Sequence, residues 1–157
     1  MGVRRITGGA LAALALGVGI TACGGDDEGT SEDTASATEV TVTTGDADDG
    51  FSWDVSPTPT AETESISYVN ESKEPHALIF ARLSEGFTVD EAYKLQGRKG
   101  SATSVAESDE KTSPGPGETV TIDVTEDIEP GNYVLLCPIP GNPPHYQQGQ
   151  LDEFEIG

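Results

Sequence analysis

Seven short segments rich in β-branched and aromatic residues most tightly limit what this chain can fold into. Each is five to eight residues long, and turn residues and polar stretches separate them. The segments are residues 38–42, 51–55, 64–70, 76–83, 118–124, 132–137 and 151–156. Apolar and polar residues alternate in "FSWDV" (51–55), which is typical of a half-buried strand, whereas "HALIFARL" (76–83) is apolar enough for a strand buried on both faces. The pattern predicts an all-β chain folded as an antiparallel β-sandwich.

One helix interrupts the predicted strands, at "TVDEAYKLQG" (88–97). Thr88 stands at the N-cap position, Glu91 follows three residues later as in a capping box, and Gly97 is a typical stop. The polar residues 98–117 that follow are predicted to form a long loop. The helix is therefore expected to be a short insertion between two strands.

The N-terminus has the layout of an export signal. Two arginines, Arg4 and Arg5, precede a short apolar run that glycines interrupt, which favours a signal peptide over residues 1–22 rather than a permanent membrane span. The run ends in "ITAC" followed by two glycines, which resembles a bacterial lipobox, and the resemblance implies that Cys23 is acylated. The alternative is an ordinary signal peptide cut near Ala22, which would leave a free thiol.

The charge of the chain excludes one class of partner. Residues 23–38 hold many acids and almost no large apolar residue, so they are predicted to be a disordered acidic tether before a single domain, residues 39–157. The whole chain has eight basic and 28 acidic residues, and loss of Arg4 and Arg5 with the signal peptide leaves a net charge of −22. Such a chain repels phosphate, so nucleic-acid binding is not expected. The acidity itself is most simply explained by solvation or by adaptation to salt.

Four potential metal donors accompany the last strands. Cys137 ends one predicted strand, His145 lies eight residues later and Gln150 five residues after that, while His76 opens the buried strand 61 residues upstream of Cys137. With Cys23 lipidated, Cys137 has no cysteine partner in an oxidising compartment. Strand ends distant in sequence converge at one end of a β-sandwich, and two imidazoles, one thiolate and a weak fourth donor make a trigonal copper site.

These segments resemble the cupredoxins, the blue-copper family. "VNESKEPH" is similar to the strand end with an asparagine, here Asn70, before the first histidine, here His76, and "GNYVLLCPIPG" to the lead into the cysteine, here Cys137. "HYQQGQ" is similar to the family's histidine, three residues, glycine and axial ligand, which would be His145 and Gln150. The resemblance covers residues 39–157 and implies a Greek-key β-sandwich that binds one copper ion.

Two features depart from the common family pattern. The loop from Cys137 to His145 is longer than in plastocyanin or azurin, and Pro143 and Pro144 offer a way to bulge the additional residues outward. Gln150 stands where most members carry methionine, as in stellacyanin-like members, so either an amide is the axial ligand or the site no longer binds metal.

Each candidate residue also has a purely structural explanation. A lone cysteine at a strand end is commonly a buried apolar residue, and single histidines such as His76 and His145 are commonly surface or loop residues. Gln150 could be an ordinary polar residue of the last strand, and Asn70 a turn residue rather than a brace for the metal loop. The two histidines and the cysteine are expected to be ligands together or not at all.

Three functions follow from these possibilities. The first is a lipid-anchored electron carrier on the outer face of the cell membrane, with one copper ion and a redox partner protein; the second is a copper-binding or storage lipoprotein; the third is a metal-free interaction module. Catalysis by the chain alone is not expected, because copper enzymes that activate substrates need further histidines and the chain has two in all.

Overall fold

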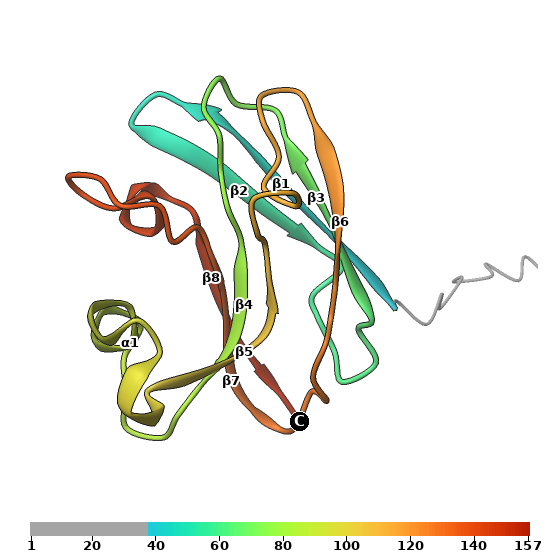
Figure 1. Ribbon diagram of the computed structural model, residues 1–157, viewed down its shortest axis with the longest axis vertical. Helices are drawn as coiled ribbons and strands as arrows, with labels where there is room; N and C mark the ends of the chain where they lie inside the picture. Colours follow the sequence, from blue (N-terminus) through green and yellow to red (C-terminus); the bar gives the residue numbers. More distant parts are fainter. Residues whose placement is uncertain (1–37) are drawn as a thin grey trace, which may run out of the picture. The chain divides into compact units, whose positions relative to one another are not determined.

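The computed structural model describes residues 38–157, which form two four-stranded β-sheets (Figure 1). The predicted signal peptide, Cys23 and the tether up to residue 37 lie outside the described residues. In spatial order, the first sheet contains β2 (Gly50–Ser56), β1 (Glu39–Ala47), β3 (Ser65–Asn70) and β6 (Thr119–Asp123). The second sheet contains β5 (Ala102–Glu107), β4 (Ile79–Leu83), β7 (Gly131–Leu136) and β8 (Leu151–Ile156).

The predicted β-sandwich is confirmed, with one departure from antiparallel pairing. After β2 runs back along one edge of β1, β3 pairs with the opposite edge of β1 and is parallel to it. The other neighbouring strands are antiparallel. The chain then crosses between the sheets from β3 to β4, from β5 to β6 and from β6 to β7, as a Greek-key sandwich requires.

The prediction of a loop over residues 98–117 was wrong, because this segment contains an eighth strand, β5. β5 lies at the edge of the second sheet and pairs with β4, where the register shifts between Phe80 and Ala81. Of its six residues only Val105 and Ala106 are buried, so the sequence lacks the alternation that identifies a strand. Pairing with β4, rather than local sequence, makes this segment extended.

The main core fills the space between the sheets. Its fully buried side chains include Val40, Ile66, Tyr68, Phe80 and Leu135. Alternate residues of β1 and β3 reach this core, while the intervening residues are partly exposed.

A second, smaller core lies on the outer face of the second sheet, where helix α1 (Val89–Leu95) covers it. The cluster contains Ala81, Val89, Val134, Leu136 and Tyr146. Figure 1 shows α1 on this outer side, together with the loop between β7 and β8. Successive residues of β4 and β7 face the two cores in turn, which explains why both segments are continuous apolar runs in the sequence.

The sequence signals for α1 are also confirmed. Thr88 is the N-cap, and the reciprocal bonds of the capping box with Glu91 are both present. The helix ends at Gln96 in the left-handed conformation, one residue before the predicted Gly97, and a short 3-10 turn, η1 (Arg98–Gly100), follows. No helix within residues 38–157 is long and apolar enough to span a membrane.

Candidate metal centre

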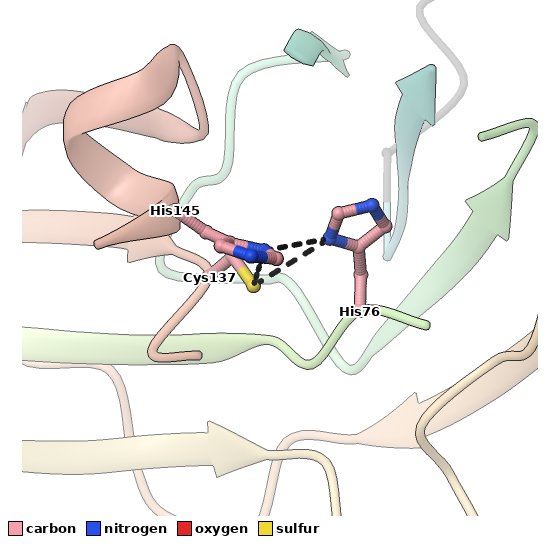
Figure 2. Close-up of side chains that lie close together, drawn as sticks. All are labelled: His76, Cys137 and His145. Atoms are coloured by element: carbon pink, nitrogen blue, oxygen red, sulfur yellow. Dashed lines mark hydrogen bonds between the residues drawn. The ribbon is translucent and has the colours of Figure 1, made fainter. Parts of the chain in front are cut away.

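The structure brings together three of the predicted ligands, His76, Cys137 and His145 (Figure 2). The sulfur of Cys137 lies 3.8 Å from Nδ1 of His76 and 3.8 Å from Nδ1 of His145. The two Nδ1 atoms are 3.2 Å apart. Among the histidine, cysteine and acidic side chains of the described residues, these three form the group that could hold a metal ion.

The topology explains how residues far apart in the sequence meet. β4 and β7 are antiparallel neighbours, and Ile79 at the start of β4 is opposite Leu136 at the end of β7. His76 precedes the first of these residues and Cys137 directly follows the second. The loop after Cys137 then brings His145 back at the start of the 3-10 turn η2 (His145–Gln148), and the backbone N–H of Cys137 donates to the carbonyl of Gln150 over 3.1 Å.

The donor separations fit a trigonal metal ion. Metal–nitrogen bonds of about 2.05 Å and a metal–sulfur bond of about 2.3 Å, set at 120°, place the two nitrogens about 3.5 Å apart and each nitrogen about 3.8 Å from the sulfur. The observed values are 3.2, 3.8 and 3.8 Å. The side chains therefore need little movement to hold an ion between them.

Burial favours the neutral forms of His76 and Cys137 when no cation is present. His76 and Cys137 are 0% exposed and His145 is 8% exposed. Burial, with a smaller contribution from the charge of His145, lowers the pKa of His76 to about 4. Burial raises the pKa of the Cys137 thiol, although backbone N–H groups of Ala77 and Ile139 act in the opposite direction by stabilising the thiolate. A cation between the donors would favour the thiolate further.

Gln150 lies beside this cluster, as predicted. Its side chain is completely buried, and its Nε2 donates to the hydroxyl of Thr44 and lies 3.1 Å from Nδ1 of His76. Its Oε1 has no hydrogen-bond partner among the described residues. An unpaired buried amide oxygen is costly, so a cation that accepts this fourth donor would relieve the cost. The role of Gln150 as axial ligand stays a prediction.

A hydrogen-bond network fixes the ring of His76. Its Nε2 lies 2.8 Å from the hydroxyl of Ser72, so a proton on Nε2 leaves the lone pair of Nδ1 directed at the cluster. Ser72 donates to Oδ1 of Asn70, and Nδ2 of Asn70 donates to the carbonyls of Glu74 and Pro114. Asn70 therefore braces the segment that carries His76 through buried hydrogen bonds. This is the less common of the two roles considered for it, a brace or a turn residue.

Phe51 is a residue of the site that the sequence did not identify. Its ring centroid lies 4.6 Å from that of His76 and 4.8 Å from that of His145. The alternation in residues 51–55 indicated only that Phe51 belongs to a strand. The backbone of Gly149 packs closely on the carbonyl of Phe51, and a Cβ at position 149 would collide with that carbonyl. The close contact between β2 and this segment therefore depends on a glycine. No local sequence signal distinguishes this contact.

Comparisons with known proteins support the fold. No protein-family model matches the sequence, and no curated protein matches it. Dithionite-reduced auracyanin from the photosynthetic bacterium Roseiflexus castenholzii superposes with a TM-score of 0.51 at 24% identity, over 76% of this chain and 97% of that one. Auracyanin A, a blue copper protein from Chloroflexus aurantiacus, gives a TM-score of 0.47 at 22% identity, over 76% of this chain and 99% of that one. The architecture and the likeness to the Roseiflexus auracyanin show that the chain has the cupredoxin fold.

Proposed function

We propose that the protein holds one copper ion between His76, Cys137 and His145 and carries single electrons. The observation that carries the proposal is the buried cluster of two Nδ1 atoms and one sulfur, with separations of 3.2–3.8 Å. Two histidines and one cysteine in a trigonal set, with a distant fourth donor, are the ligands of electron-transferring copper sites. Bound copper would supply a reversible change between its +1 and +2 states.

The chemistry of the donors supports the choice of metal. The auracyanin that shares this fold is described as reduced with dithionite. In the present chain, the thiolate and imidazoles are ligands that suit copper, and the amide oxygen of Gln150 is proposed as the weak axial donor.

The surroundings of the cluster favour electron transfer over catalysis. His76, Cys137 and Gln150 are completely buried, and of the four proposed ligands only His145 retains some exposure. The burial of the donors limits the access of a substrate to the ion, whereas an electron needs only a short path through His145. The hydrogen bond between His76 and Ser72 restrains one imidazole, and the packing of Phe51 restrains both, which favours small rearrangement when the charge of the site changes.

The N-terminal features complete the proposal. The lipobox-like "ITAC" and the acidic residues after it support acylation of Cys23, which would hold the domain on the outer face of the cell membrane near a redox partner protein. Replacement of Cys23 with alanine is expected to release the protein from the membrane fraction or to leave an unprocessed precursor. A wild-type protein found wholly in the soluble fraction, with its N-terminus at another residue, would contradict the anchor.

Redox cycling of the copper-loaded protein tests the proposed activity. We expect the visible absorption of the oxidised site to disappear with a mild reductant and to return fully with an oxidant, over repeated cycles and without loss of metal. Copper that is released on reduction, or that cannot be reduced, would instead support the storage function. Failure of the folded protein to bind copper would leave the metal-free interaction module.

A further inference from the structure

Helix α1 makes hydrogen bonds to both ends of the loop that runs from Cys137 to His145. At one end, the hydroxyl of Tyr93 donates to the carbonyl of Pro138 over 3.3 Å. At the other end, the hydroxyl of Tyr146 donates to Oδ1 of Asp90 over 2.8 Å. Each contact lies one residue from a proposed ligand, because Pro138 follows Cys137 and Tyr146 follows His145.

The contact at the second end is reinforced twice. Gln147 donates through Nε2 to the same oxygen of Asp90 over 3.2 Å and to the Tyr146 hydroxyl over 3.0 Å. The rings of Tyr93 and Tyr146 also pack together, with centroids 4.7 Å apart. The Tyr146 side chain is only 5% exposed, and it belongs to the outer core with Val89. Tyr146 is thus held by packing as well as by its hydroxyl.

The loop also has hydrogen bonds of its own. The N–H of His145 donates to the carbonyl of Ile139 over 3.1 Å, and the Gln148 side chain donates to the carbonyl of Pro143 over 2.7 Å. These bonds join the loop to itself and to the adjoining turn η2, so they do not connect it to α1. The bonds that Asp90 accepts and Tyr93 donates join both ends of the loop to α1.

From these contacts we infer that Asp90, Tyr93 and Tyr146 are positioning residues, which hold His145 and Cys137 in the geometry that retains copper. The inference rests on the proposed function, since it assigns these residues a role in the same site. Asp90 matters most, because one exposed carboxylate on a seven-residue helix accepts bonds from two consecutive residues after the ligand His145. Its hydrogen bond with Tyr146 lowers the pKa of Asp90 and, with burial, raises the pKa of Tyr146.

Three substitutions separate the hydrogen bond from charge and packing. Tyr146→Phe removes the hydroxyl and keeps the ring, without a change of charge. Asp90→Ala removes the acceptor and one negative charge, and Asp90→Asn removes the charge but keeps an oxygen acceptor. Glu129→Ala is the matched control, because Glu129 is an exposed acid whose side chain pairs with Arg82 over 2.5 Å, away from the loop between Cys137 and His145.

The primary measurement is the rate at which copper leaves the full-length protein in the presence of an excess of chelator, with the position of the visible band recorded on the same samples. We expect Tyr146→Phe and Asp90→Ala each to accelerate release about fivefold, the effect of one hydrogen bond of ordinary strength, and to shift the band. In the double variant the two effects should combine to less than their product, because both single variants remove the bond between Tyr146 and Asp90. Asp90→Asn and Glu129→Ala should behave as the wild type.

A second measurement does not need copper. Amide hydrogen exchange in the metal-free protein should become faster at residues 139–148 in Tyr146→Phe and Asp90→Ala, and stay unchanged there in Glu129→Ala. If the wild type binds no copper, the proposed function fails, while the exchange rates still decide whether α1 restrains the loop. The inference is overturned if the variants match the wild type in both measurements, if the two single effects add, or if Asp90→Asn behaves as Asp90→Ala.

Discussion

The two sheets of the sandwich are built differently, and the difference explains where the metal donors lie. In the first sheet, alternate residues of β3 are buried and the others are partly exposed. In the second sheet, four successive residues of β7, from Tyr133 to Leu136, are buried, because α1 covers the face that turns away from the main core. Two of the completely buried proposed ligands, His76 and Cys137, lie next to β4 and β7, the strands packed on both faces.

The first sheet contributes to the site from the other side. The Thr44 hydroxyl of β1 accepts a bond from Gln150, and Phe51 of β2 packs on both imidazoles. One sheet therefore carries the donors and the other covers them. The comparison indicates that the sheet packed on both faces supplies the geometry of the site, while the more exposed sheet supplies its enclosure.

The largest effect should come from the donor directly after β7. Replacement of Cys137 with serine is expected to abolish the intense thiolate-to-copper absorption, because a hydroxyl is neither as soft nor as readily deprotonated as a thiol. Visible spectra of copper-loaded wild type and variant make the comparison. A Cys137→Ser protein that keeps the band would end the blue-copper interpretation.

A matched pair of valines tests the difference between the sheets. Val134 and Val69 both face outward from interior strands, but Val134 is 2% exposed under α1, whereas Val69 is partly exposed. Val134→Ala should lower the free energy of unfolding by about 2 kcal/mol, and Val69→Ala by less than about 1 kcal/mol. Urea unfolding of the metal-free variants measures both. Equal losses would contradict the account of a second core.

A smaller effect is expected at Gln150, where the two sheets meet. An amide oxygen is harder than a thioether and favours Cu(II), so Gln150→Met should raise the reduction potential. Each kcal/mol of differential stabilisation corresponds to roughly 40 mV for one electron. Redox titration of the two proteins side by side measures the shift. An unchanged or lowered potential in the methionine variant would exclude Gln150 as the axial ligand.

Residue type and spacing were sufficient to predict the parts of the site that are chemically unusual. His76, Cys137, His145 and Gln150 were singled out because their residue types and spacing suit a copper site, and the structure places all four side chains together. That they bind a metal stays a prediction. Seven of the eight strands were likewise predicted, because their burial appears as alternation or as an apolar run.

The remaining features depend on tertiary contacts that leave no local pattern. β5 is an edge strand whose polar residues give no alternation, Phe51 is one apolar residue of an ordinary strand, and Asp90 is one of 28 acids in the chain. The role of each follows from the element that packs against it. Their positions had to come from the structure.

The most direct test of the central claim is a titration of the metal-free, full-length protein with Cu(II), followed by visible absorption. The separations among His76, Cys137 and His145 predict an intense band that grows linearly and saturates at one copper ion per chain. A folded protein that gives no such band, or one that continues to bind copper without saturation near one equivalent, would contradict the claim.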